Sequence, residues 1–180
     1  ALFVGILLTV FQYLGFVSKT VYEESVSHLT EIFHQSDNML SELTNKNLTY
    51  LHIWGEYLHN TSDESEIREY IEKAQEDAGF LDFYFLSADG NYKMATGETG
   101  YLGLQEDIGE DIRQGNDVIA NAALPGKSQL LVFSTPEAHG IYQGFEYDAI
   151  AIAYENSDIV EVLDISAFNG NAQSFIVHPD

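Results

Sequence analysis

The stretch FLDFYFLSADGNYKMATGE, residues 80–98, predicts a β-hairpin. Aromatic and aliphatic residues alternate through its first half, the letters ADGN interrupt the run, and a second short apolar run follows. An Asp-Gly pair between two apolar runs is a strong signal for a tight turn between antiparallel strands. Alternation places Phe83 and Phe85 on one face of the first strand, and Tyr84 and Leu86 on the other.

Upstream of this hairpin, residues 18–60 predict one long helix, ~60 Å in length. Its apolar side chains recur in alternating steps of four and three, with Ser36 and Asn47 as polar interruptions. The stripe consists of Tyr22, Val26, Leu29, Phe33, Ser36, Leu40, Leu43, Asn47, Tyr50, Trp54 and Tyr57. Such a stripe buries itself against its own domain or against the same helix of a second subunit, so we expect a homodimer as one outcome.

Residues 1–17, ALFVGILLTVFQYLGFV, carry no charged side chain. As a helix they would be ~25 Å long, slightly shorter than a hydrocarbon core of ~30 Å. Because the first residue is Ala and not Met, we expect preceding residues to complete a membrane span. A signal peptide and a buried soluble helix are the alternatives, although no small-x-small cleavage site follows the run.

Downstream of the long helix, a helix over 65–79 is expected, with apolar residues at helical spacing and Gly79 as its C-terminal cap. The other expected elements are a loop with room for one helical turn over 97–116, a short helix over 117–127, a strand over 129–136, a turn or flap over 137–147, a strand over 148–155, a helix over 157–168 and a strand from 173. Four or five antiparallel strands with helices on one side make an α+β fold, in which the long N-terminal helix packs on the sheet.

The charge balance excludes some partners. The chain has 29 acidic and 7 basic side chains, a net charge of -22, so it lacks the basic surface that nucleic acid binding requires. An anionic membrane surface would repel the folded part for the same reason. The shortage of Lys and Arg after residue 17 suits the outer side of a membrane. There is no cysteine, which excludes disulfides and thiolate metal sites.

Catalytic and metal-binding motifs are weak. His52, Glu56 and His59 are spaced i, i+4 and i+7 and share a helix face that could hold a metal ion, but a solvated face explains the spacing equally well. The Gly-rich segment 96–103 lacks the spacing and the Lys of a phosphate-binding loop. The sequence has neither a Gly-x-Ser-x-Gly elbow nor a His-Glu-x-x-His motif. We therefore expect no catalytic residue, no metal and no cofactor.

Small side chains at Ala149, Ala151 and Ala153 occupy one face of the strand predicted over 148–155. This face has two interpretations of equal weight. It either receives the long helix in close packing, or it borders a cavity lined by tyrosine hydroxyls.

Several phrases resemble the extracytoplasmic Cache sensor domains of bacterial receptors, a PAS-like fold of chemoreceptors, sensor histidine kinases and diguanylate cyclases. The hairpin quoted above is similar to the first hairpin of that fold, and NAALPGKSQLLVFSTP is similar to the turn that leads into its third strand. DAIAIAYENSDIVEVL is similar to its last strand and exit helix, and QSFIVHPD to the first strand of a second, membrane-proximal module.

The resemblance implies four regions: a partial transmembrane helix over 1–17, a stalk or dimerisation helix over 18–60, a Cache-like domain over 61–168 and a truncated second module over 169–180. Amino-acid-binding members carry Arg-x-Trp-Tyr before the Ala-Ala-Leu turn, where this chain has Asp-Val-Ile-Ala over 117–120. A carboxylate thus replaces the cation that would bind an amino-acid carboxylate.

The resulting hypothesis is a small-molecule sensing input domain outside the membrane of a bacterial receptor, without catalysis. A structural or adhesive surface domain without a ligand is the alternative. We expect the ligand between the sheet and the 97–125 segment, under the 137–147 flap. The candidate contacts are Tyr84, Asp117, Asn121, Phe133, Tyr147 and Asp148. These groups favour a neutral or cationic ligand, unless Arg113, Lys93 or Lys127 swings into the site from a loop.

Overall fold

The computed structural model describes residues 2–104, 106–124 and 129–162. Along the chain, the elements are α1 (Leu2–Asn60), α2 (Glu64–Ala78), β1 (Asp82–Leu86), β2 (Asn91–Met94), β3 (Thr99–Tyr101), α3 (Glu106–Arg113), β4 (Val118–Ala123), β5 (Gln129–Thr135), β6 (Gly140–Tyr142), β7 (Phe145–Tyr147), β8 (Ala149–Glu155) and α4 (Asn156–Val162).

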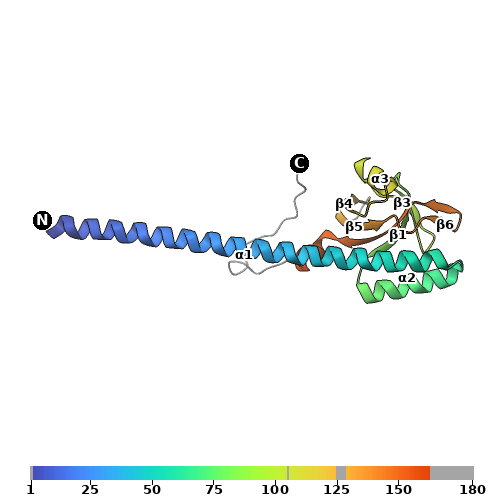
Figure 1. The fold of residues 1–180 in the computed structure, drawn as a ribbon, viewed down its shortest axis with the longest axis horizontal. Helices are drawn as coiled ribbons and strands as arrows, with labels where there is room; N and C mark the ends of the chain where they lie inside the picture. The colour runs from blue at the N-terminus through green and yellow to red at the C-terminus, as the bar shows by residue number, and fades with distance from the viewer. Residues whose placement is uncertain (1, 105, 125–128, 163–180) are drawn as a thin grey trace.

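The described residues form three layers. The middle layer is an antiparallel six-stranded sheet in the order β3-β2-β1-β8-β5-β4, and β6 pairs with β7 in a separate hairpin. The C-terminal part of α1 and the whole of α2 lie along one side of the sheet, and α3 lies on the other (Figure 1). The predicted α+β class, with a long N-terminal helix packed on an antiparallel sheet, is confirmed.

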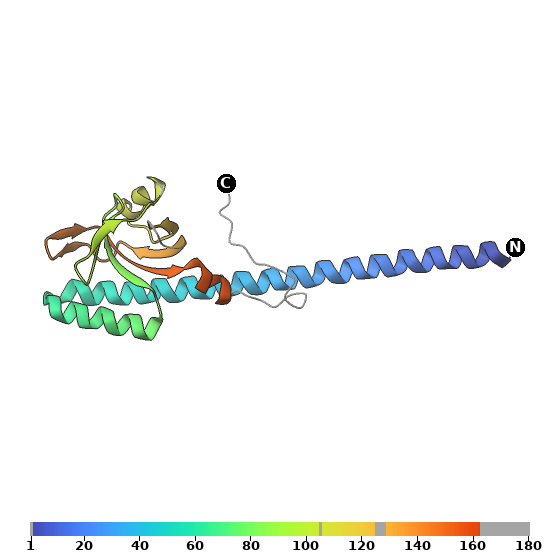
Figure 2. The ribbon, with the colours of Figure 1, turned by 180° about the vertical axis from the view of Figure 1, so that it is seen from behind.

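The helix α1 is continuous and projects far beyond the sheet, as the view from behind also shows (Figure 2). Its C-terminal part packs on the domain through Leu51, Trp54 and Leu58, which are at most 7% exposed. The N-terminal part of the same stripe is uncovered, with Tyr22 and Phe33 each 70% exposed. Of the helices described, none contains a stretch that is both long and apolar enough to span a bilayer.

The helix α2 begins and ends where its sequence predicts. The side chain of Asp63 accepts hydrogen bonds from the backbone N–H groups of Ser65 and Glu66, which satisfies two of the free donors at the N-terminus. Gly79 ends the helix with φ of 72°, a left-handed conformation that costs glycine little. Ile67, Ile71 and Ala74 form its buried face.

The predicted hairpin is β1 and β2, and the turn between them fits its sequence. The Ser87 N–H donates to the Asn91 carbonyl at 2.8 Å, and the Gly90 N–H donates to the Ser87 carbonyl at 2.9 Å. Gly90 has φ of 84°, so the chain forms a three-residue loop with glycine in the left-handed position. A Cβ at Gly90 would lie 2.8 Å from the Leu102 carbonyl oxygen, so the segment before α3 lies directly on this turn.

The sheet has two distinct buried faces. The face toward α1 and α2, here called the helical face, carries large side chains: Phe83, Phe85, Phe133, Ile150, Ile152 and Tyr154. The face toward α3, here called the α3 face, carries Tyr84 and Leu86 together with the three alanines of β8. The long helix therefore packs on the isoleucine side of β8, so of the two interpretations of the alanine face, close packing of the long helix is wrong.

Two other local predictions are wrong. Residues 118–123 form strand β4, not a helix, because they pair with β5 along their whole length. The segment 97–116 contains strand β3 and the eight-residue helix α3, which is more regular structure than the predicted loop with one helical turn. The flap over 137–147 contains the β6–β7 hairpin. The strand expected from 173 and the second half of the helix expected over 157–168 lie outside the described residues.

Candidate ligand-binding site

Two hollows flank α3. The larger, here called the α3–hairpin hollow, has a volume of about 420 Å³ and lies between the C-terminal end of α3 and the β6–β7 hairpin. The residues that give it chemical character are Ile112, Arg113, His139, Glu146, Tyr147 and Asp148. The smaller, here called the α3–β4 hollow, measures about 250 Å³ and is bordered by Asp107, Asp111, Asp117 and Asn121. The larger volume lies within the usual range for small-molecule sites.

The turn of the first hairpin positions the charged groups of the α3–hairpin hollow. Its Ala88 N–H donates to Asp148 Oδ2 at 2.7 Å, and its Asp89 Oδ1 accepts from Arg113 Nη2 at 2.9 Å. A cation from α3 and an anion from the start of β8 are thus both held by one tight turn. The residues that line the hollow come from other elements, so the β1–β2 hairpin contributes to the site by holding Arg113 and Asp148 in place.

Glycine at position 109 allows α3 to lie this close to the turn. A Cβ at Gly109 would lie 2.3 Å from the Ala88 carbonyl oxygen, far inside normal contact. The close approach brings Arg113, one turn further along α3, within reach of Asp89. Glu110 also contacts Arg113, at 3.5 Å.

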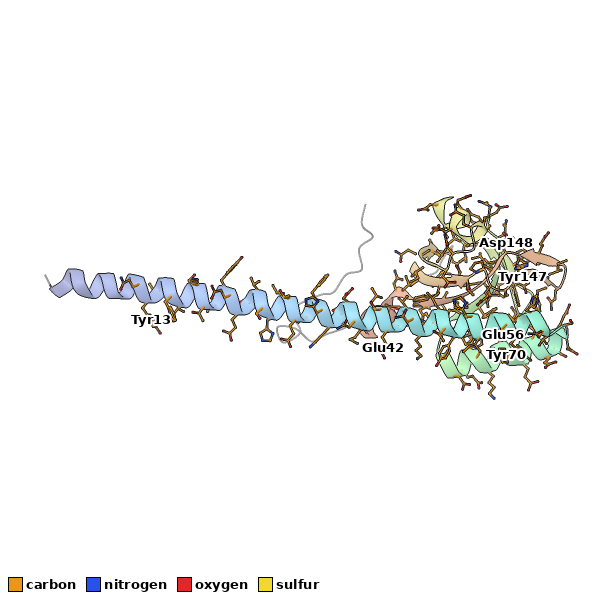
Figure 3. The ribbon with its side chains drawn as sticks, viewed as in Figure 1. Tyr13, Glu42, Glu56, Tyr70, Tyr147 and Asp148 are labelled. Atoms are coloured by element: carbon orange, nitrogen blue, oxygen red, sulfur yellow. The ribbon has the colours of Figure 1, made fainter. Side chains whose placement is uncertain are left out.

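Tyr147 and Asp148, two of the six predicted contacts, line the α3–hairpin hollow. They lie next to each other at the end of the domain that carries β6 and β7, far from Tyr13 on the projecting part of α1 (Figure 3). Burial raises the pKa of the Tyr147 phenol, so this side chain remains a neutral hydrogen-bonding group at physiological pH.

Asp117 and Asn121 border the other hollow, on the far side of α3. The β4–β5 register pairs Asn121 with Leu131, so Asn121 points toward the helical side at the uncovered edge of the sheet. Asp117, just before β4, reaches the same side and contacts His52 of α1 at 2.9 Å. The structure therefore does not bring these two residues together with Tyr147 and Asp148.

Tyr84 and Phe133 are core residues on opposite faces of the sheet, and both are 0% exposed. The Tyr84 hydroxyl donates to Asp82 Oδ2 at 2.9 Å, and burial raises the pKa of this phenol strongly. Phe133 lies under α1 and contacts Tyr154 edge to face. Neither side chain lines one of the hollows beside α3.

Sequence reasoning missed the contribution of α3 and of the flap. Arg113, predicted as a cation on a loop, belongs to α3 and lines the hollow. Lys93 is held elsewhere, where its Nζ donates to the Gln143 carbonyl, and Lys127 lies outside the described residues. The available signal for His139 and Glu146 was their position in the flap that was expected to cover the ligand.

The His52, Glu56, His59 face has no metal-binding geometry. No group of three or more His, Asp or Glu side chains in the described ranges is arranged to hold a metal ion. His52 contacts two carboxylates on other elements instead, Asp117 and Glu137.

Comparison with known proteins identifies the fold. No family model matches the chain, and no curated protein sequence matches it significantly. Among solved structures, it is similar to the sensory domain of the Campylobacter jejuni chemoreceptor Tlp3 (CcmL) with isoleucine bound, with a TM-score of 0.54 and 11% identity over 81% of this chain. It is similar to the ligand-binding domain of Tlp3 with L-valine at a TM-score of 0.53 and 12% identity, again over 81% of the chain.

The L-norvaline complex of Tlp3 gives a TM-score of 0.54 at 10% identity, over 80% of this chain and 63% of that one. The chain spans 65% of the isoleucine and valine complexes, less than two thirds of their length. The fold is therefore that of a chemoreceptor sensory domain, the Cache-type fold that the resemblance predicted.

Proposed function

We propose that this chain is the extracytoplasmic, ligand-binding input domain of a bacterial signal-transduction receptor and has no catalytic activity of its own. The observation that carries the proposal is a chemoreceptor sensory fold with a charged hollow of about 420 Å³ beside α3. Ligand binding there stabilises one arrangement of α3 and the flap relative to another. A corresponding shift of α1 transmits this conformational change toward the membrane. The rival function, a structural or adhesive surface domain, requires no response to any small molecule.

We propose a neutral or cationic small molecule as the ligand of the α3–hairpin hollow. Glu146 and Asp148 place two carboxylates in its lining, while Arg113 is already shared between Asp89 and Glu110. An anionic ligand would have to compete with both carboxylates for Arg113, and would lose hydration without gaining a free cation. The amino acids bound by Tlp3 carry a carboxylate, so the ligand proposed for this chain belongs to a different chemical class from the ligands of Tlp3.

A thermal-shift measurement with putrescine, ethanolamine, valine and acetate as probes tests the ligand class. We expect the amines to raise Tm and acetate to leave it unchanged, since a ligand at 100 times its Kd stabilises by ~2.7 kcal/mol. Glu146→Gln removes one charge from the hollow and should abolish most of the amine response. Glu42→Gln is the matched control, because Glu42 is an exposed carboxylate on α1 (Figure 3).

A rise in Tm with acetate or valine that survives Arg113→Ala would show that the polarity proposed for this hollow is wrong. An amine response of equal size in Glu146→Gln and Glu42→Gln would place the binding site elsewhere on the acidic surface.

We also propose that residues 1–17 lead into the bacterial cell membrane and that the domain faces the outside. The uncharged run at 1–17 and the acidic remainder of the chain support this orientation.

The uncovered stripe on α1 supports a second proposal, that α1 pairs with the α1 of another copy. Val26, Leu29 and Phe33 are 43%, 52% and 70% exposed, which leaves a row of large apolar side chains without cover in the single chain.

Cysteine crosslinking tests this pairing on the naturally cysteine-free chain. A Val26→Cys variant should form disulfide-linked dimers, and adding Leu29→Asp and Phe33→Asp should lower the linked fraction by about tenfold or more, since each buried side chain contributes ~1.5–3 kcal/mol. Gln35→Asp with Asn38→Asp adds the same charge off the stripe and should leave crosslinking intact. Crosslinking that survives the stripe substitutions would rule out pairing through this face.

A further inference from the structure

Three elements far apart in the sequence meet at one imidazole. His52 lies on α1, and its Nε2 is 2.9 Å from Asp117 Oδ2 at the start of β4. Its Nδ1 contacts Glu137 Oε2 on the loop between β5 and β6. Asp117 is 65 positions away from His52 in the sequence, and Glu137 is 85 positions away.

The geometry demands a charged ring. A neutral imidazole has one N–H donor and one bare nitrogen, whereas ionised carboxylates can only accept. With a carboxylate at each nitrogen, the protonated ring satisfies both contacts, and the neutral ring leaves a nitrogen lone pair facing an oxygen. The carboxylates also raise the pKa of His52, with the Glu137 hydrogen bond as the largest cause, while partial burial opposes them.

We infer that His52, Asp117 and Glu137 form a proton-dependent clasp that ties α1 to the two segments bordering the ligand hollows. Asp117 borders the α3–β4 hollow, and Glu137 follows Pro136, which borders the α3–hairpin hollow. The clasp itself stands without the proposed ligand sensing, but its use as a signal rests on that function. The domain then senses acidity as a second input through the helix that leads to the membrane.

The loop that carries Glu137 is built to lie on α1. Ala138 is 1% exposed, and the Cβ of a residue at position 55 would be 3.4 Å from the Ala138 Cβ, so the loop lies in van der Waals contact with α1 at Gly55. Gly55 and His52 are three positions apart and therefore lie on the same face of α1. Opening the ring contacts therefore removes one of the attachments that hold this loop on the helix.

The pH dependence has a definite sign. Because the pKa of His52 is raised in the folded state, the clasp stabilises fully below the ordinary imidazole range and loses its contribution as pH rises through the raised value. The charged groups that face the ring are Asp117, just before β4, and Glu137 from the β5–β6 loop, and Glu56 lies one turn further along α1.

The test uses the 180-residue chain and needs no ligand. NMR titration of the His52 ring should give a pKa above the ordinary imidazole value, and the combined Asp117→Asn and Glu137→Gln variant should bring that pKa down. At about pH 5.5, His52→Gln should lower Tm by about 2–4 °C relative to the unsubstituted chain, and this difference should vanish by about pH 9. His28→Gln, an exposed histidine on the projecting part of α1, should show no such pH-dependent difference.

A His52 titration that is unchanged in the double variant overturns the clasp. So does a Tm difference between His52→Gln and the unsubstituted chain that is the same at both pH values. If His52→Gln does not fold, the titration of the unsubstituted chain against the double variant decides alone. If no probe binds but the His52 pKa falls in the double variant, the proposed ligand sensing is contradicted and the clasp is supported. If a probe binds but the His52 pKa is unchanged in the double variant, the clasp is contradicted and the proposed ligand sensing is supported.

Discussion

Replacing Trp54 with Ala is expected to lower the free energy of unfolding by about 3–5 kcal/mol, the usual cost of removing a large aromatic side chain from a core. Trp54 is 7% exposed and lies where α1 meets both α2 and the first strand. Its ring stacks on Tyr50 at a centroid distance of 5.6 Å and packs against Phe80 at 5.5 Å and Phe83 at 6.4 Å. The neighbouring rings cannot collapse into the space without losing these contacts, so a cavity remains.

Urea denaturation measures this loss, and the adjacent residue supplies the control. Ile53 is 54% exposed on the same helical turn, so Ile53→Ala should change the free energy of unfolding by less than about 0.5 kcal/mol. Equal effects of the two substitutions would show that α1 does not pack on the sheet in solution through its Trp54 side.

The second large effect is expected from Gly109→Ala. In an open helix this replacement stabilises by ~1 kcal/mol, because alanine is the better helix former. At Gly109 the added Cβ would meet the Ala88 carbonyl oxygen at 2.3 Å, and backbone on both sides leaves no flexible group to yield. We expect a net destabilisation of about 1–3 kcal/mol, with α3 displaced from the β1–β2 turn.

Displacement of α3 should also separate Arg113 from Asp89 and weaken the response to amine probes in the α3–hairpin hollow. Urea denaturation and the thermal-shift screen measure the two consequences separately. Gly15→Ala is the control, since Gly15 lies in α1 with nothing within 4 Å of the added Cβ. A Gly109→Ala variant as stable as the Gly15→Ala variant would contradict the close approach of α3 to the turn.

Elements with strong local signals were predictable. The absence of proline before position 125 and the stripe of four-and-three spacing predicted the continuous helix α1. The Asp-Gly pair predicted the β1–β2 turn, and Gly79 predicted the end of α2. The alternation in β8 correctly separated its alanine face from its isoleucine face. Each of these signals is contained within a few neighbouring residues.

The errors occur where local preference conflicts with pairing at a distance. The sequence VIANAA of β4 contains three alanines, which favour a helix when judged alone, and it becomes a strand because β5 supplies its hydrogen-bond partners. For α3 the sequence predicted one helical turn at most, because this short, acidic segment has little apolar surface. Its position depends on one glycine that lies against Ala88.

The amino-acid sequence by itself thus determined the α+β class, the long helix, the first hairpin and the acidic charge balance. The tertiary structure alone decided which polar groups meet. Arg113 reaches Asp89 across 24 residues, Asp148 reaches Ala88 across 60, and His52 reaches Glu137 across 85. Periodicity and turn chemistry report on neighbours a few positions away, whereas a binding site forms from segments whose proximity depends on the register of the whole sheet.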